Sequence, residues 1–415
     1  MEIENDDSNK IKVGDFVVVQ RQGYTKLHKI KNHSILVLGS FHIEMDNVIG
    51  ERYFDTFQMK NITNNKKLYT LEKVDEVNSI IDSLNIEKSG SDNRNIQINA
   101  ESQGLTKDDI DKLKDEQFGS SNIVEQLVSN SKTFNMKTEY SQEKYLKKKE
   151  KKYFEYIVIR KPTIRLLVLM FYRQDPTKTL GIRIDDLSQI LTYANIHPEG
   201  NHLLYDSGTS GLLPAAITSA IGSKTEGHLI HMHPGNECQK NAFMAMQFPP
   251  EQTQRCINVN LYSVLRCFHQ NKESFDGISD NKTEDNSGEP PAKKTKIESK
   301  EEGTPKKSWQ MDNERACRIL SKKVDSLIIT AKEHPVNITK ELLQFLNGNR
   351  QFVVFHILKE PLQDLYNYLK TRVDIISIRL FNNFMRNYQV LPDRTHPEVN
   401  MCSGGYILTG YKLSC

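Results

Sequence analysis

Lysines and tyrosines alternate in a short run of the chain. Its members are Lys144, Tyr145, Lys147, Lys148, Lys149, Lys151, Lys152 and Tyr153. On a helix this spacing gathers ammonium groups, with an aromatic ring near each end of the run. Ammonium groups neutralise phosphates and release counterions, and an aromatic ring can stack on an unpaired base. The run is therefore typical of a nucleic-acid contact, although a solvated charged helix explains this segment equally well by itself.

Three further segments carry side chains that suit phosphates and base edges. After a predicted strand come Arg379, Asn382, Asn383, Arg386 and Asn387, and later the turn Ser403, Gly404, Gly405 and Tyr406, whose glycines let the backbone approach a ligand. Arginine forks and asparagine amides serve both kinds of contact. Ordinary strand-connecting loops are an equal alternative. For the third segment, Asp92, Asn93, Arg94 and Asn95, a plain linker is the favoured alternative.

A candidate cofactor loop follows another predicted strand. Asp206, Gly208 and Gly211 lie between this strand and a helix, where a nucleotide-type cofactor binds in Rossmann-type folds. The next strand ends at His231-Met-His-Pro and supplies no carboxylate for a ribose. A later strand ends at Thr330, where a base methyltransferase would need a carboxylate to accept a proton. The sequence therefore predicts a degenerate loop, no catalytic residue and, for want of a third ligand beside His231 and His233, no metal site.

Two kinds of domain must position these segments. Short β-branched runs between residues 11 and 50 predict a small β-barrel, which we assign to residues 1–75. Residues 76–152 follow as a linker and a helical, basic segment. In it, Thr106 with Asp109 three residues later is a helix-capping signal.

Alternating strands and helices begin at Tyr156. This rhythm predicts a Rossmann-like, largely parallel sheet whose two halves are residues 153–270 and 308–415. Residues 271–307 are rich in Ser, Asp, Glu, Lys, Gly and Pro, which predicts a disordered insertion between the halves. The chain is expected to end in a hairpin that pairs Tyr388–Leu391 with Gly405–Leu408. The predicted class is thus α/β with an N-terminal β-barrel.

Composition excludes several classes of protein. The 415 residues hold 56 Lys and Arg against 53 Asp and Glu, so a net charge of +3 rules out a histone-like polycation. None of the 6 cysteines forms a CxxC pair, which argues against a zinc ribbon or a thioredoxin-like site. The polar, acidic first ten residues and the lack of a long apolar run predict no secretion signal and no membrane span. The basic motif at residues 291–296 predicts a nuclear location, although a charge-balanced loop explains it nearly as well.

At this point the chain resembles a known family, the non-catalytic subunits of the eukaryotic tRNA (adenine-58, N1) methyltransferase. The resemblance spans most of the chain, and residues 386–394 are its most specific segment. The other matching segments are Gly14–Val18, Asp46–Gly50, Asp92–Ile96, Leu105–Ile110 and Lys144–Tyr153.

The resemblance implies a division of labour between two subunits. A homologous catalytic partner would hold S-adenosylmethionine and methylate adenosine 58 of the tRNA T loop, in a heterotetramer of two plus two. This chain would bind no cofactor and would grip the tRNA through the clusters given above. The resemblance adds four tRNA contacts that the residue types alone do not single out, namely Lys178, Arg183, Arg315 and His334.

Two other functions stay open from the sequence. Asp206 and its glycine loop would suit a stand-alone S-adenosylmethionine-dependent RNA methyltransferase. The nearly balanced charge of +3 also permits a structural scaffold without RNA contact.

Overall fold

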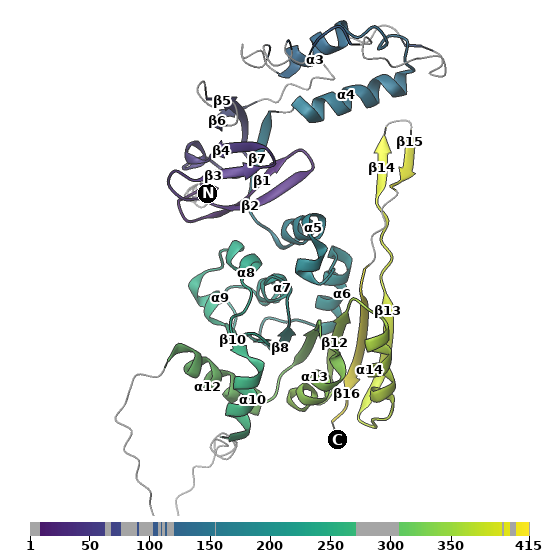
Figure 1. Cartoon of the computed structure of the whole chain (residues 1–415). Helices are drawn as coiled ribbons and strands as arrows, with labels where there is room; N and C mark the ends of the chain where they lie inside the picture. Colours follow the sequence, from purple (N-terminus) through teal and green to yellow (C-terminus); the bar gives the residue numbers. More distant parts are fainter. Residues whose placement is uncertain are drawn as a thin grey trace, which may run out of the picture. The chain divides into compact units, whose positions relative to one another are not determined.

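The computed structural model describes residues 9–62, 68–75, 89–90, 103–106, 109, 113, 120–153, 155–270, 307–391, 394–398 and 404–414. The chain divides into two compact units, Met1–Pro162 and Thr163–Cys415 (Figure 1). None of the helices in these described ranges is long and apolar enough to cross a membrane.

The first unit is built on a seven-stranded sheet that almost closes on itself. Its strand order is β2 (Tyr24–Lys29), β1 (Phe16–Arg21), β7 (Tyr156–Arg160), β5 (Thr56–Asn61), β6 (Leu68–Val74), β4 (Phe41–Glu44) and β3 (Ile35–Leu38), with the short helix η2 (Asp46–Val48) after β4. Between the edge strands, the Lys26 ammonium donates to the Val37 carbonyl oxygen at 2.6 Å. His28 Nε2 lies 3.2 Å from Ser34 Oγ at the same seam. Side chains therefore bridge the gap, and the prediction of an N-terminal barrel is confirmed.

Strand β7 belongs to this first sheet, although the sequence assigned it to the second domain. It pairs antiparallel with β1 (Val19 opposite Ile159) and with β5 (Phe57 opposite Ile157). Ile157 and Ile159 are fully buried in the barrel core. Local periodicity shows that a strand exists but does not show which sheet buries it. The second unit accordingly begins at Thr163 rather than near residue 153.

Among the described residues, two helices lie between β6 and β7 along the chain. They are α3 (Ser120–Ser129) and α4 (Glu139–Tyr153), and a small apolar core holds them together through Leu127 of α3 and Leu146 of α4. Upstream, the Thr106 backbone N–H donates to Asp109 Oδ2 at 3.1 Å, and the Asp109 backbone N–H donates to Thr106 Oγ1 at 3.3 Å. This reciprocal pair is the predicted capping signal.

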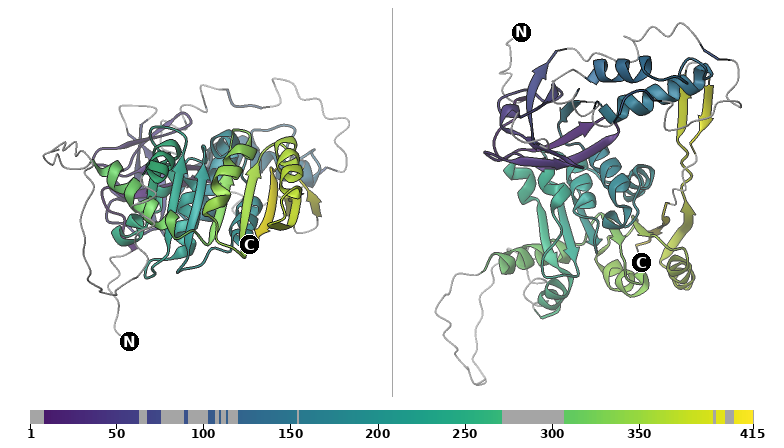
Figure 2. Two further views of the ribbon diagram at one scale, coloured as in Figure 1. Left: turned by 90° about the horizontal axis from the view of Figure 1, so that it is seen from below. Right: turned by 45° about the horizontal axis from the view of Figure 1, so that its top comes forward.

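The second unit has a seven-stranded sheet with helices on both faces (Figure 2). Its order is β10 (Cys256–Asn260), β9 (His228–His233), β8 (Asn201–Asp206), β11 (Ser326–Thr330), β12 (Arg350–His356), β16 (Tyr406–Lys412) and β13 (Ile375–Asn382). The first five strands are parallel, and β16 runs antiparallel to both β12 and β13. All five residues of β11 are buried, as expected for a central strand covered on both faces. The prediction of a Rossmann-like sheet is confirmed.

The helices of this unit connect the strands in turn. They are α5 (Ile164–Gln174), η4 (Pro176–Thr179), α6 (Ile184–Ala194), α7 (Leu212–Ile221), α8 (Asn241–Ala245), α9 (Pro250–Gln254), α10 (Leu261–Gln270), α12 (Ser308–Ser321), α13 (Pro335–Leu342), η5 (Leu343–Phe345) and α14 (Glu360–Lys370). Buried residues of α10, α12, α13 and α14 form one core with the sheet, for example Val264, Leu320 and Leu365.

The C-terminal hairpin differs from the prediction. Tyr388–Leu391 is strand β14, and it pairs with β15 (Arg394–Pro397) rather than with residues 405–408. Strand β16 instead lies between β12 and β13, where Ile407 and Leu408 are fully buried. Val390 remains 74% exposed. Burial of apolar side chains therefore decides which partner β16 takes.

A buried histidine joins β8 to β11 at their amino ends. His202 Nδ1 lies 2.7 Å from Ser326 Oγ, and its Nε2 lies 3.0 Å from the His197 carbonyl oxygen. Because a carbonyl oxygen only accepts, Nε2 carries the proton and Nδ1 accepts from the serine hydroxyl. Burial lowers the pKa of His202 to about 4. The imidazole is therefore neutral in the folded protein.

We expect this histidine to make the fold sensitive to acid. Its folded pKa lies below the ordinary value of 6.5, so its stabilising contribution is complete above pH 6.5 and is lost as the pH falls toward 4. The full contribution corresponds to about 3 kcal/mol. Urea unfolding between about pH 7 and pH 4.5 should show a steeper loss of free energy of unfolding for the wild type than for His202→Asn. Parallel curves for the two proteins would contradict this role.

Candidate nucleic-acid interface

The predicted basic run forms a cationic face on helix α4. Lys144 and Lys148 are exposed, and Lys147 is 44% exposed with its ammonium 2.5 Å from Glu143 Oε1. Leu146 is buried on the other side of the helix, since residues two apart are separated by about 200°. Lys151 and Lys152 occupy the last turn of α4, and their side chains lie outside the described part of the structure. Helix α4 thus presents lysines on the side opposite its apolar core.

The two tyrosines of the run pack against the protein itself, and burial of Tyr153 argues against the predicted stacking role for that ring. Tyr153 is only 7% exposed, because it lies seven residues after Leu146 and packs in the same core. The Tyr145 ring lies 5.6 Å from the Phe134 ring, and the ammonium groups of Lys137 and Lys149 lie 4.7 and 5.2 Å from its centroid. Both rings are therefore occupied by the protein itself.

Most of the other predicted contacts gather at the carboxyl ends of the second unit's strands. Asn382 and His356 both lie opposite Tyr406 in the sheet, which places the ends of β12 and β13 beside the start of β16. Ser210 Oγ donates to the Lys178 carbonyl oxygen at 2.7 Å, which brings η4 to the same edge. His334 follows β11 at this edge as well. The fold therefore unites residues that lie up to about 230 positions apart in the sequence.

Several side chains are exposed at this edge and in the segment that leads from β13 to the hairpin of β14 and β15. Lys178 is 68% exposed, with its ammonium 3.9 Å from Asp175 Oδ2. The exposed set further comprises Arg379, Asn382, Arg386 and Asn387. His334 is also exposed, and its Nε2 lies 3.2 Å from Asp364 Oδ2. These groups are available to a polyanion in solution.

Three predicted contacts serve the protein's own packing instead. Arg183 is 2% exposed and its guanidinium is bonded to Asp185. An added Cβ at Gly404 would lie 2.9 Å from the Arg183 guanidinium, and one at Gly405 would lie 2.3 Å from the Phe355 ring. The close approach that these glycines permit is therefore to neighbouring side chains of the same unit, which corrects the prediction that a ligand requires it.

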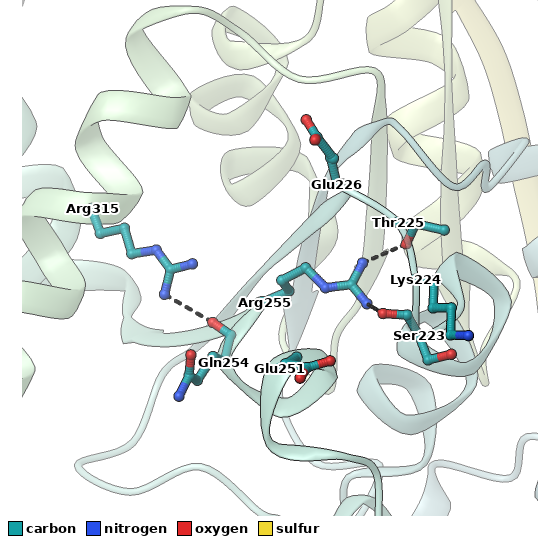
Figure 3. Close-up of a pocket in the computed structure, with 8 residues that line it drawn as sticks. All are labelled: Ser223, Lys224, Thr225, Glu226, Glu251, Gln254, Arg255 and Arg315. Atoms are coloured by element: carbon teal, nitrogen blue, oxygen red, sulfur yellow. Dashed lines mark hydrogen bonds between the residues drawn. The ribbon is translucent and has the colours of Figure 1, made fainter.

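Arg315 is separated from the other predicted contacts. It lies near the amino ends of β9 and β10, beside a pocket of about 430 Å³ (Figure 3). Arg315 Nη1 donates to the Gln254 carbonyl oxygen at 2.8 Å, and Arg255 Nη2 donates to the Ser223 carbonyl oxygen at 3.0 Å. Because the strands of this part of the sheet are parallel, this is the edge opposite to Lys178 and Asn382. Arg315 cannot join the same contact surface.

The backbone N–H groups of the predicted cofactor loop bond to side chains of the same chain. Asp206 accepts from the backbone N–H groups of Gly208 and Thr209, each at 2.9 Å. The Ser210 N–H donates to Gln239 Oε1 at 2.8 Å. The exposed Lys332 side chain also reaches this loop, because a Cβ added at Gly208 would lie 3.0 Å from its ammonium nitrogen. Three backbone donors of the loop are thus engaged by the chain's own side chains.

A neutral histidine completes this site. His231 Nδ1 lies 2.7 Å from Asn258 Oδ1, and its Nε2 lies 3.8 Å from Asp206 Oδ2. Burial lowers the pKa of His231. Thr330 at the end of β11 is fully buried and offers no carboxylate. Within the described ranges no group of three or more His, Cys, Asp and Glu side chains could hold a metal ion.

Sequence reasoning missed Gln239, Lys332 and Asp186. The first two come from loops after β9 and β11, and their residue types carry no signal for packing against a distant glycine loop. Asp186 had a signal, because it lies three residues after Arg183 at a helix start, which is the capping-box spacing. The predicted contacts Asp92, Asn93, Arg94, Asn95 and Ser403 lie outside the described residues.

The parallel sheet with an antiparallel strand inserted near its end, and a glycine loop after strand β8, defines the Rossmann-like class of methyltransferase folds. A solved O-methyltransferase of this class from Thermotoga maritima superposes with a TM-score of 0.50 at 12% identity, covering 99% of this chain and 97% of that one, which shows the fold. The family model of Gcd10p matches residues 10–304, and the chain belongs to the Gcd10p family.

Relatives in this family carry a specific name. A mouse protein that is 32% identical, covering 96% of this chain and 88% of the relative, is the "tRNA (adenine(58)-N(1))-methyltransferase non-catalytic subunit TRM6". A Dictyostelium discoideum protein with the same name is 30% identical and covers 98% of this chain and 80% of the relative. The resemblance inferred from the sequence is confirmed.

Proposed function

We propose that this chain is the non-catalytic subunit of a tRNA (adenine-58-N1)-methyltransferase. It would bind tRNA so that the catalytic partner methylates adenosine 58 in the T loop. The observation that carries this proposal is a methyltransferase fold whose cofactor loop bonds to Asp206 and Gln239, and whose strand β9 ends in histidines rather than in a carboxylate. The names of the mouse and Dictyostelium relatives support it.

The absence of a cofactor on this chain is part of the proposal. S-adenosylmethionine needs room above the glycine loop and a carboxylate for its ribose. Here Lys332 lies above Gly208, and β9 ends in His231 and His233. His231 is neutral and hydrogen-bonded within the sheet. The missing carboxylate at the end of β9 supports the proposal that the methyl donor binds to the partner.

The tRNA grip would come from exposed cations on both units. Helix α4 offers Lys144, Lys147 and Lys148, and the second unit offers Lys178 and Arg386. Phosphate contacts of this kind give affinity without reading sequence. The base-specific step would then fall to the catalytic partner, which must reach adenosine 58.

The assembly and the location are further parts of the proposal. The partner would be a homologous catalytic subunit, in a heterotetramer of two plus two, as the family resemblance implies. The basic motif at residues 291–296, which lies outside the described residues, supports a nuclear location.

Methyl transfer to an unmodified tRNA transcript tests this function. The assay compares this chain alone, the catalytic partner alone and the co-purified complex. We expect activity only in the complex, and no heat of S-adenosylmethionine binding by this chain in calorimetry. Activity of this chain alone would show instead a stand-alone methyltransferase. Full activity of the partner alone, with tRNA crosslinking only to the partner, would favour a scaffold without RNA contact.

A further inference from the structure

A buried polar cluster joins three segments of the second unit at the carboxyl ends of its strands. Arg183 precedes α6, Asn383 follows β13, and Gly404 precedes β16. Arg183 is 2% exposed and Asp186 is fully buried. Charged groups are rarely buried so completely unless they are paired. The hydrogen-bond partners of Arg183 and Asp186 therefore indicate the structural role of the cluster.

The Arg183 guanidinium ties the start of α6 to the end of β13. Its Nε and Nη2 donate to the two oxygens of Asp185 at 2.9 and 2.6 Å, which is a bidentate pair. Nη2 also donates to the Asn383 carbonyl oxygen at 3.0 Å. Burial opposes the charged guanidinium, but the bonds to Asp185 outweigh it and raise the pKa of Arg183. The group is fixed in place before any ligand arrives.

The Asp186 carboxylate provides a second connection between the start of α6 and the end of β13. Its Oδ1 accepts from Asn383 Nδ2 at 2.9 Å, and its Oδ2 accepts from the Arg183 backbone N–H at 3.3 Å. Burial raises the pKa of Asp186, so ionisation of this carboxyl depends on those donors. Loss of either donor would leave a buried acceptor unpaired, which is costly.

The Gly404 turn closes over this pair. An added Cβ would lie 2.9 Å from Arg183 Cζ and Nη2 and 3.0 Å from Asp186 Oδ2. The turn therefore fits against the cluster only without a side chain. Hydrogen bonds thus join the start of α6 to the end of β13, and the Gly404 turn packs against them.

We propose that Arg183, Asp186 and Asn383 are positioning residues for tRNA binding, and that none of them touches the RNA. This inference rests on the function proposed above. The cluster fixes η4, which carries Lys178, relative to the segment between β13 and β14, which carries Arg386. Both side chains are exposed. Preorganised cations lose less conformational freedom when RNA binds, so the cluster raises affinity from a distance.

The Asp185→Asn substitution tests this role, because a positioning role and a direct phosphate contact predict opposite changes in tRNA affinity. If Arg183 bound a phosphate directly, removal of the adjacent negative charge would free the guanidinium and strengthen tRNA binding. The positioning role predicts the reverse, because the bidentate pair is broken. In the complex with the catalytic partner we expect KM for tRNA to rise roughly five-fold, with kcat and KM for S-adenosylmethionine unchanged. A variant that merely unfolded in part would lower kcat at constant KM.

Gly404→Ala tests the same cluster by crowding. We expect a comparable rise in KM for tRNA, and no change for the matched control Gly235→Ala, whose nearest neighbour would be the Glu237 carbonyl oxygen at 3.6 Å. Because much of the crowding acts on the guanidinium, Gly404→Ala should cause a smaller further loss in the Arg183→Ala background than in the wild type. If the Gly404→Ala variant does not assemble with the catalytic partner, the Asp185→Asn variant alone tests the proposal.

Stronger tRNA binding by Asp185→Asn, or fully additive effects in the double variant, would overturn the positioning role. That result would leave the proposed function intact, provided that the wild-type complex still requires this chain to bind tRNA. If the catalytic partner alone bound tRNA as tightly as the wild-type complex does, the proposed function would be overturned instead. Thermal midpoints of all complexes establish that each variant is folded at the assay temperature.

Discussion

We expect the triple substitution of Lys144, Lys147 and Lys148 by alanine to weaken tRNA binding by the assembled complex by roughly 10- to 100-fold at physiological salt. These lysines form the exposed cationic face of α4, opposite buried Leu146. Each lysine–phosphate contact releases bound counterions, so the loss of three contacts should lower the slope of log affinity against log salt by about 2–3. Alanine is the strongest helix former, so α4 itself should persist.

Filter binding or anisotropy with a fixed tRNA, measured across salt concentrations, checks this prediction. Lys307, Lys322 and Lys323 provide a matched control, because all three are exposed and their replacement by alanine removes the same charge. If the control weakens binding as much as the α4 variant does, the effect comes from net charge rather than from a defined contact. Unchanged affinity of the α4 variant would remove this helix from the grip.

The second large effect is expected from Gly405→Ala, which should destabilise the second unit by about 3 kcal/mol. The added Cβ would lie 2.3 and 2.5 Å from ring atoms of Phe355 and 3.0 Å from the His356 carbonyl oxygen. Phe355 is fully buried in β12, so the ring has little room to move away. The thermal midpoint should fall by roughly 6–12 °C for a unit of this size.

Calorimetry of the wild type and of four variants measures this effect, namely Gly405→Ala, Phe355→Leu, the double variant of these two, and Gly235→Ala. Phe355→Leu shortens the side chain and makes room, so Gly405→Ala should cost less in that background than in the wild type. Gly235→Ala serves as the neutral control, since no atom would come closer than 3.6 Å to its added Cβ. An equal cost of Gly405→Ala in both backgrounds would show that the Phe355 ring is not the source of strain.

The sequence by itself determined the features that depend on local pattern. Apolar runs with turn residues between them predicted the N-terminal barrel, and strands alternating with helices predicted the Rossmann-like sheet. The capping pair of Thr106 and Asp109 was evident from spacing. The missing carboxylate at the end of β9 is a local fact as well, and the prediction of a degenerate cofactor loop rests on it.

Only the tertiary structure decided how distant residues meet. Periodicity alone did not show that β7 joins the first sheet, or that Tyr153 belongs to the α3–α4 core. Residue type alone did not show that Arg183 is paired with Asp185 and Asn383, or that Arg315 lies at the opposite edge of the sheet. The residue type does not show whether an arginine contacts a phosphate or a buried carboxylate. The difference lies in register and burial, which depend on contacts between residues up to about 200 positions apart.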